Sequence, residues 1–348
     1  MKLLPDTLTI IKKFIQTRVQ EADAKGVVLG LSGGIDSATT LALAVSSLGS
    51  EKVKGLIMPF KSTESISLAQ NHADSLNVET KEYNISSIVE SYKGTTDSYS
   101  SKASEGNLHS RIRMSLLYGE AFSSKYLVIG TSNKSELLVG YYTKWGDGAS
   151  DFLPMGDLYK SQVYTLARDL QVPSKILDRV PTAELWEGQS DEEELGISYD
   201  NLDKIAMFIK DHDKLNELSS DINNLNKNIV KEDYQISTSI IDNLFEKLGE
   251  ISGTEEFANR LDDLYSLIDS EEKDVGKISD TSSEVIMLFD KEIKWRKYAS
   301  KNLMSELEKY NLVIKNNIGL RLQSRLTKDQ AKFVAKCNSV HRDISLNF

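Results

Sequence analysis

The segment from Leu29 to Thr40 reads LGLSGGIDSATT and lies between two apolar runs. The run before it, 27–29 (VVL), is typical of a short buried strand, and the run after it, 41–45 (LALAV), is typical of a buried helix. A strand, a glycine-rich turn and a helix in this order make an anion site, because the N–H groups of the turn and of the first helical turn converge there. The segment therefore predicts a phosphate-binding loop within an α/β fold.

Strand and helix patterns alternate through the first third of the chain. Apolar runs predict four strands, the third of them more polar, at 27–31, 53–58, 78–85 and 126–129. Apolar positions at helical spacing predict helices at 7–24, 37–48, 64–76 and 105–122. This order indicates a doubly wound, mostly parallel sheet with helices on both faces. Ligands of such sheets bind beyond the carboxyl ends of the strands, here in the loops after Leu31, Met58 and Ile129.

The C-terminal half has a different composition. All five prolines lie at or before Pro181, and segments such as 240–248 and 284–310 are rich in Leu, Ile, Glu and Lys. These segments are predicted to form amphipathic helices. Residues 211–274 are mainly acidic and residues 291–325 mainly basic, so the two stretches could pair, although a solvated helix face is the simpler interpretation of any one charge.

Bulk composition excludes several classes of protein. The net charge of −10 argues against a general nucleic-acid binder, which usually has a basic face. The single cysteine, Cys337, can form neither an internal disulfide nor a CxxC pair. No apolar run approaches the ~20 residues that span a bilayer, and the N-terminal residues lack a signal-peptide pattern. We therefore expect a cytoplasmic protein with no membrane or nucleic-acid partner.

The residues of the predicted phosphate loop suit magnesium-bound phosphates. Gly33 and Gly34 allow the backbone to approach a phosphate closely, and Ser32 and Ser37 add hydroxyl donors. Asp36 cannot bind phosphate directly, so its natural partner is a Mg²⁺ ion that bridges to phosphate oxygens. The pattern is neither GxxxxGK[ST] nor GxGxxG, and a serine-capped helix after a tight turn is the structural alternative.

The motif SGGIDS resembles the pyrophosphate-binding loop of the PP-loop ATP pyrophosphatases. Three further stretches, GTSNKSELLVG at 130–140, SDF to GDLYK at 150–160 and PTAELW at 181–186, are together similar to the ammonia-dependent NAD synthetases. So is NLHSRIRMSLLY at 107–118. The resemblance covers most of residues 1–205. It implies an adenine nucleotide α-hydrolase-like fold and an enzyme, a ligase that adenylates deamido-NAD with ATP and replaces AMP by ammonia to give NAD, AMP and pyrophosphate.

The resemblance also implies site residues. Asp36 and Glu136 match the family's magnesium ligands, and Asp36 and Lys160 the groups expected to act in catalysis. The residues that match ATP contacts are Gly30, Leu31, Ser32, Gly33, Gly34, Ile35, Asp36, Ser37, Thr131, Lys160 and Thr182. Those that match deamido-NAD contacts are Arg111, Lys144, Asp151, His341 and Arg342. Without the resemblance, Glu136 would be a helix-terminal carboxylate and Lys160 a surface lysine.

The chain departs from the family's pattern in its C-terminal part. His341-Arg342 stands where the family has a His-Lys pair. Residues 1–209 are predicted to be the synthetase core, 210–320 a helical insert, and 321–348 a tail that returns to the active site. The insert could be a separate subdomain, an extension of a dimer interface or a docking arm. Residues 141–153, with several glycines and an exposed Trp145, are predicted to form a mobile lid.

Partners and alternative functions follow from the same comparison. The family is homodimeric, so the resemblance implies a homodimer. Cys337 lacks the context of a glutaminase nucleophile, so free ammonia is the expected nitrogen source unless a separate glutaminase docks. The alternatives are another PP-loop adenylating ligase or amidotransferase, such as one acting on tRNA, and a diverged nucleotide-binding regulatory protein that uses the helical insert as an interaction surface.

Overall fold

The computed structural model describes residues 3–61, 63–182, 188–248, 255–270 and 272–289. Within them the chain divides into two compact units at Asp203 and Lys204. Each unit has its own hydrophobic core. His341, Arg342 and the predicted tail 321–348 lie outside the described residues.

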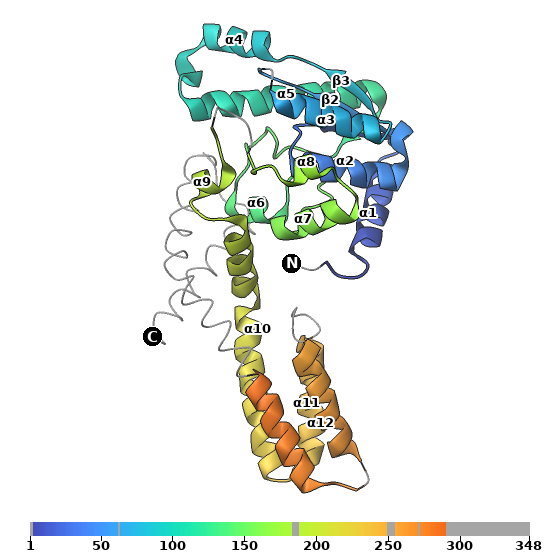
Figure 1. Cartoon of the computed structure of the whole chain (residues 1–348), viewed down its shortest axis with the longest axis vertical. Coiled ribbons are helices and arrows are strands. Elements are labelled where there is room, and N and C mark those ends of the chain that lie inside the picture. The colour runs from blue at the N-terminus through green and yellow to red at the C-terminus, as the bar shows by residue number, and fades with distance from the viewer. Residues whose placement is uncertain (1–2, 62, 183–187, 249–254, 271, 290–348) are drawn as a thin grey trace. The chain divides into compact units, whose positions relative to one another are not determined.

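The first unit is built on a four-stranded parallel sheet (Figure 1). The strand order is β3-β2-β1-β4. The strands are β1 Gly26–Gly30, β2 Val53–Ile57, β3 Glu79–Glu82 and β4 Tyr126–Val128. In the register, Val27 of β1 is paired with Val53 of β2 and with Leu127 of β4. The fold is therefore the parallel α/β arrangement predicted from the alternation of strands and helices.

Helices cover both faces of this sheet because β1 buries side chains on both sides. Val27 and Leu29 belong to one core, to which three helices contribute, α1 (Thr7–Glu21), α2 (Ile35–Leu48) and α7 (Lys160–Asp169). Val28 lies between them in the sequence and packs in the other core, beside Leu108 and Ile112 of α5 (Lys102–Ser124). Successive residues of a strand point to opposite faces, so this partition is the signature of a doubly wound sheet. The polar β3 lies at one edge of the sheet, with no buried residue.

The helices of the first unit lie between and after the strands. Their bounds are α1 Thr7–Glu21, α2 Ile35–Leu48, α3 Glu64–Ser75, α4 Ser86–Thr95, α5 Lys102–Ser124, α6 Lys134–Val139, α7 Lys160–Asp169, α8 Ser174–Leu177 and α9 Asp191–Leu195. Helix α5 starts three residues before its predicted start at 105, because Ser101 and Ser104 form a reciprocal capping box there. Helix α4 was not predicted.

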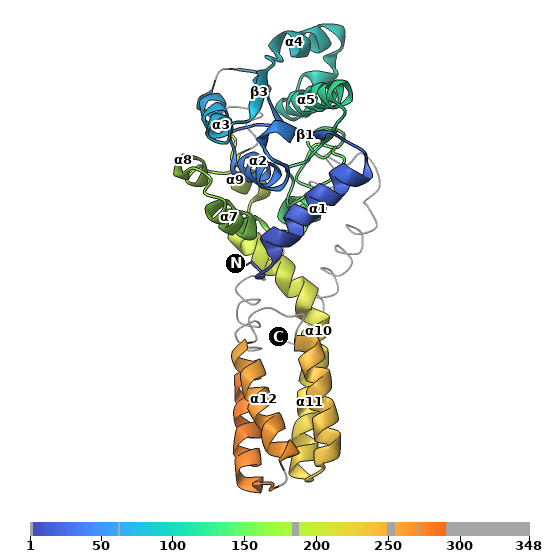
Figure 2. The same cartoon turned by 90° about the vertical axis from the view of Figure 1, so that its right-hand side faces the viewer.

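The second unit consists of helices, and these lie side by side in both views (Figures 1 and 2). They are α10 Tyr199–Val230, whose first turn belongs to the first unit, α11 Tyr234–Leu248, α12 Glu255–Asp269 and a helix at 275–289. Their core is apolar and includes Ile222, Ile241, Leu261 and Val285. Helicity is confirmed for 240–248 and for 284–289, while 290–310 lies outside the described residues. That 210–320 is an insert stays a prediction.

Membrane insertion finds no support in these helices. Among the residues that the structure describes, none of the helices combines the length and the apolar composition that a bilayer span requires.

Candidate active site

The loop between β1 and α2 has the conformation that its glycines predict. Gly33 has a φ of +77°, and a Cβ atom there would lie 2.4 Å from the backbone oxygen of Ser65, so only glycine fits. The Gly34 N–H donates to Ser32 Oγ at 3.2 Å, and the Ser37 hydroxyl donates to the Gly34 carbonyl at 3.0 Å. Helix α2 begins at Ile35. The loop is thus a compact turn that opens into a helix N-terminus, as an anion site requires.

A buried lysine lies beside this loop. Lys160 is the first residue of α7, and its side chain is only 1% exposed. Its ammonium contacts Asp36 Oδ2 and lies 3.1 Å from Glu136 Oε1. The same ammonium stands 4.8 Å from the ring centroid of Tyr199. The structure therefore brings together the two predicted catalytic residues and the two predicted metal ligands.

The electrostatics of this cluster are those of a desolvated site. Burial raises the pKa of Glu136 to about 8; the Lys160 ammonium opposes this rise and the Asp36 carboxylate adds to it. Burial also disfavours the charge of Lys160, but Asp36 and Glu136 outweigh burial and raise the pKa of the lysine. Lys160 therefore stays an ammonium at neutral pH. With so high a pKa, the Glu136 carboxyl is mostly protonated at neutral pH, and a further cation beside it would favour its ionised form.

Asn133 joins the cluster to the start of α6. Its side-chain oxygen accepts the backbone N–H of Glu136, and the Glu136 carboxylate accepts the backbone N–H of Asn133 at 3.2 Å, which is a capping box. The Asn133 amide also donates to Asp36 Oδ1 at 3.0 Å. One side chain thereby fixes Glu136 on its helix and aligns it with Asp36, ninety-seven residues away from Asn133 in the sequence.

Asp203 was not predicted, yet it ties α6 to α7. It is fully buried and accepts hydrogen bonds from the Ser135 hydroxyl and, at 2.8 Å, from the Ser161 N–H. Ser135 in turn accepts the Lys160 N–H at 2.9 Å. Burial raises the pKa of Asp203, and these hydrogen bonds oppose the rise. Asp203 and Tyr199 both belong to the first turns of α10, and neither was singled out from the sequence.

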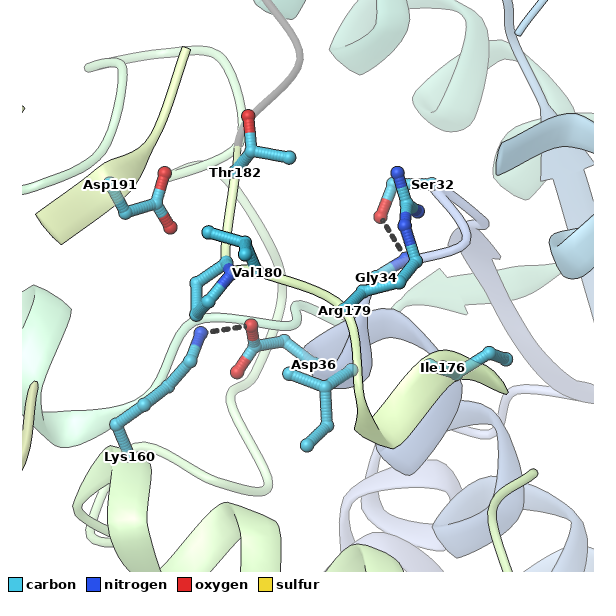
Figure 3. A pocket seen from close by; sticks show the side chains of 11 residues that line it. Ser32, Gly34, Asp36, Lys160, Ile176, Arg179, Val180, Thr182 and Asp191 are labelled. Atoms are coloured by element: carbon cyan, nitrogen blue, oxygen red, sulfur yellow. Dashed lines mark hydrogen bonds and ion pairs between the residues drawn. The ribbon is translucent and has the colours of Figure 1, made fainter. Parts of the chain in front are cut away.

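A cavity opens in front of this cluster (Figure 3). Six of the predicted ATP-binding residues line it, namely Ser32, Gly34, Ile35, Asp36, Lys160 and Thr182. The other five, Gly30, Leu31, Gly33, Ser37 and Thr131, do not line this cavity; Thr131 follows β4 and lies five residues before Glu136. The two other charged residues of the wall, Arg179 and Asp191, were not singled out from the sequence. Arg179 lies two residues before the PTAELW motif at 181–186, so a charged residue this close to the motif could have been predicted to be a site residue.

Three of the predicted deamido-NAD residues lie around the loop 141–153. The Arg111 guanidinium donates to the Lys144 carbonyl at 3.2 Å. Asp151 accepts the Val128 N–H at 2.7 Å, at the end of β4. Tyr118 donates to the other oxygen of Asp151 at 3.3 Å. Arg111 and Lys144 are thus neighbours, whereas Asp151 supports the strand end, and their roles in substrate binding stay predictions.

The predicted lid is a compact turn held against α5 in this structure. The Ser110 hydroxyl donates to Asp147 Oδ1 at 2.6 Å, and the Thr143 hydroxyl donates to Asn107 Oδ1 at 2.7 Å. Trp145 is 66% exposed, as its sequence context predicted. Opening and closing of the loop stays a prediction.

The fit of the cluster to a metal ion depends on its two carboxylates. Among the residues that the structure describes, no group of three or more His, Cys, Asp or Glu side chains is placed to hold a metal. Asp36 and Glu136 nevertheless both contact the Lys160 ammonium, so one oxygen of each carboxyl group lies beside the same cation. Two carboxylate oxygens together with phosphate oxygens form a donor set that suits Mg²⁺.

The fold and the site together define an α/β nucleotide-binding protein with a pyrophosphate loop. The family model described as NAD synthase matches residues 7–241, and the chain belongs to this family. A relative from Thermococcus sibiricus, named NH(3)-dependent NAD(+) synthetase, is 48% identical over 204 residues, which are 59% of this chain and 80% of the relative. A relative of the same name from Archaeoglobus fulgidus is 51% identical over 57% of this chain and 81% of its own length.

Two solved structures resemble the chain. The NMN synthetase of Francisella tularensis is 36% identical, with a TM-score of 0.56 over 59% of this chain and 86% of that one. The NH3-dependent NAD synthetase of Campylobacter jejuni, in complex with the nitrate ion, is 37% identical, with a TM-score of 0.50 over 56% of this chain and 83% of that one. These likenesses agree with the parallel α/β fold.

Proposed function

We propose that the protein is an ammonia-dependent NAD synthetase, a ligase that converts deamido-NAD to NAD with ATP. The observation that carries this proposal is the buried Lys160, held between Asp36 and Glu136 beside the phosphate loop. The names of the relatives from Thermococcus sibiricus and Archaeoglobus fulgidus support the same activity.

The proposed reaction has two steps. A nicotinate carboxylate oxygen of deamido-NAD attacks the α-phosphorus of ATP, and the bond to the β-phosphate breaks so that pyrophosphate leaves. Ammonia then attacks the carboxyl carbon of the adenylate; the C–O bond breaks, AMP leaves with that oxygen, and the nitrogen loses a proton. The loop N–H groups hold the leaving pyrophosphate, and the Lys160 ammonium stabilises negative charge that develops on it.

Magnesium is part of this proposal, with Asp36 and Glu136 as its protein ligands. When bound, Mg²⁺ would supply positive charge to the phosphate oxygens. The contact of both carboxylates with one cation, the Lys160 ammonium, supports the assignment because it shows that the two side chains lie close enough to share a positive charge. Thr131 and Thr182 are proposed as further ATP contacts, the second supported by its place in the cavity wall.

The dinucleotide is proposed to contact Arg111, Lys144 and Asp151, together with His341 and Arg342 of the tail 321–348. The bond between Arg111 and the backbone of Lys144 supports a common site for the first two. The loop 141–153 would exclude water from the adenylate, whose hydrolysis would waste ATP. The protein is further proposed to be a homodimer. It is also proposed to be cytoplasmic, since a chain with a single cysteine forms no internal disulfide and does not require an oxidising compartment.

The helical region 210–320 is proposed to be a subdomain distinct from the synthetase core 1–209. The apolar core formed by helices α10, α11 and α12 supports this division, since those helices bury their side chains against one another. If a separate glutaminase docks on this region, it would deliver ammonia to the enzyme. If none docks there, free ammonia is the nitrogen source.

NMN synthesis is the second candidate, because one of the similar solved structures is named NMN synthetase. The two reactions share the amidation of a nicotinate carboxylate and differ only in whether the substrate carries an adenylyl group. The same phosphate loop and lysine would serve both.

A direct assay tests the proposal and separates the candidates. The pure protein is mixed with ATP, magnesium and either deamido-NAD or nicotinic acid mononucleotide, with ammonium or glutamine as nitrogen donor. NAD formed from deamido-NAD with ammonium alone is the expected result. Preference for the mononucleotide would favour NMN synthesis, and activity with glutamine would reveal a glutaminase. No product from either substrate, with a folded protein that binds ATP, would contradict both candidates.

A further inference from the structure

One peptide of the phosphate loop is held at both of its ends by side chains. The carbonyl of Gly33 accepts a hydrogen bond from Arg179 Nη1 at 3.1 Å. The N–H of Gly34, which belongs to the same peptide, donates to Ser32 Oγ at 3.2 Å. Because glycine flanks this peptide on both sides, its orientation is the least restricted by backbone sterics in the loop. The two side-chain bonds therefore determine which way it faces.

Arg179 also fastens the loop to the start of α3. Its Nη2 donates to Ser65 Oγ at 3.2 Å. Ser65 is buried in the first turn of α3, and its backbone oxygen occupies the position next to which a Cβ of Gly33 would lie. A single planar guanidinium thus binds two segments that touch each other, a geometry that a lysine ammonium cannot reproduce with the same orientation.

We call the two hydrogen bonds from Arg179, to the Gly33 carbonyl and to Ser65, the Arg179 clamp. Its place in the cavity matters for the binding of an anion there. Arg179 lines the same cavity as Asp36 and Lys160 (Figure 3). A Gly33 carbonyl turned into the cavity would present its negative end to a phosphate. With that oxygen bound to a guanidinium, the negative end is paired with a positive charge instead and does not repel the anion.

We propose that Arg179 is a positioning residue of the phosphate loop. Its guanidinium sets the orientation of the Gly33–Gly34 peptide, ties that peptide to Ser65, and thereby raises the affinity of the loop for pyrophosphate, both as part of ATP and as the product. The link to turnover rests on the proposed function, whereas the link to pyrophosphate binding stands without it.

The test compares Arg179→Gln with Arg179→Lys and with Arg168→Gln, which removes an exposed arginine in the last turn of α7. Titration calorimetry gives the dissociation constants of magnesium pyrophosphate and of AMP, and steady-state kinetics give KM for ATP and for deamido-NAD. We expect Arg179→Gln to weaken pyrophosphate binding and raise KM for ATP about tenfold or more, a loss in the range of one charge-assisted contact. AMP affinity and KM for deamido-NAD should stay within about twofold, and Arg179→Lys should recover part of the loss.

Two outcomes would overturn the proposal. One is pyrophosphate affinity of Arg179→Gln within about twofold of the Arg168→Gln control. The other is an equal weakening of pyrophosphate, AMP and deamido-NAD, which is the pattern of general unfolding. If Arg179→Gln does not fold, Arg179→Lys and Ser65→Ala decide: each must weaken pyrophosphate selectively, and unchanged affinity in both contradicts the clamp.

The pyrophosphate titration also keeps this proposal separate from the activity. It requires no turnover, so a wild-type protein that binds pyrophosphate but makes no NAD would refute the proposed function and leave the clamp testable. A wild-type protein that makes NAD while Arg179→Gln binds pyrophosphate normally would refute the clamp alone.

Discussion

The two units of the chain bury different kinds of side chain. At the carboxyl edge of its sheet, the first unit buries an ammonium, two carboxylates and an amide, those of Lys160, Asp191, Asp203 and Asn133. Among the described residues of the second unit, the buried polar side chains are hydroxyls only, on Ser237, Thr281 and Ser282. Charge is costly to desolvate, so burying it at one place in one unit indicates a site that uses it.

The charges of the helical unit lie at its surface instead. Arg260 contacts Asp263 at 2.7 Å and also pairs with Glu284, and all three side chains are at least 36% exposed. Such exposed ion pairs contribute little to the free energy of unfolding, and the packing of apolar side chains between the helices contributes most of it. Buried charges thus form a site in the first unit, whereas apolar packing holds the helices of the second unit together. Substitutions in each unit test this difference.

The largest expected effect is that of Asp36→Asn. The change removes a proposed metal ligand and one partner of Lys160, so the rate of NAD formation should fall at least about 10³-fold, or about 4 kcal/mol in the barrier. The thermal midpoint should stay within a few degrees, because Glu136 and the Tyr199 ring still hold the ammonium. Turnover near the wild-type rate would remove Asp36 from the chemistry.

Matched core substitutions test whether the units are separate in stability. Leu43 of α2 and Leu261 of α12 are both fully buried, in different cores. Each change to alanine should cost about 2–5 kcal/mol of unfolding free energy in its own unit. Only Leu43→Ala should lower the temperature at which ATP binding is lost. Equal loss of ATP binding in both variants would show that the helical unit stabilises the site directly.

A pH dependence of stability is expected from His109 in the first unit. Its ring packs on Phe60, with 4.2 Å between centroids, and burial, aided by the charge of Arg113 and opposed by Glu105, lowers its pKa to about 4. In the unfolded chain the pKa of this imidazole is 6.5. The stabilisation that comes from burying the neutral ring is therefore complete above that pH and is lost as the pH falls toward 4. Between pH 7.5 and 5 the loss should be ~2 kcal/mol.

Urea unfolding of the wild type and of His109→Gln at those two pH values measures the contribution of His109 to the pH dependence of the unfolding free energy. The glutamine variant cannot titrate, so its stability should fall less between the two values than that of the wild type. The second buried histidine, His72, also has a pKa lowered by burial, and His72→Gln serves as the comparison. Identical pH dependence in wild type and His109→Gln would mean that His109 is protonated inside the fold.

The smallest expected effect is that of Arg260→Gln on the helical unit. The arginine is exposed with both of its partners, so its pairs are screened by water and salt. The midpoint of thermal unfolding should be indistinguishable from the wild type and insensitive to added salt. A loss as large as that of Leu261→Ala would contradict the view that packing, and not surface charge, holds this unit together.

The sequence predicted those parts of the molecule that depend on local pattern. The sheet, the helices around it and the loop with Asp36 follow from periodicity and from glycines next to a strand. Asp203 and Arg179 were missed because their roles depend on contacts between distant segments. Arg179 and Gly33 are 146 positions apart. Nothing in a helical pattern distinguishes an aspartate that caps another helix from one that faces solvent.

The short elements were also difficult to predict. Helices α6 and α9 have six and five residues, too few for a periodic apolar pattern, and their starts are set by side-chain caps and tertiary contacts. Glu136 and Lys160 were assigned through the family resemblance and not through spacing. Their convergence on Asp36 is a tertiary fact that the structure supplies.

Oxygen transfer tests the central claim, activation of a carboxylate by AMP, most directly. Deamido-NAD labelled with ¹⁸O in its nicotinate carboxylate is converted with ATP, magnesium and ammonium, and the products are analysed by mass spectrometry. The account predicts one ¹⁸O in AMP and none in pyrophosphate, because the carboxylate oxygen stays bound to the α-phosphorus when ammonia displaces it. Label in pyrophosphate or in inorganic phosphate, with unlabelled AMP, would contradict it.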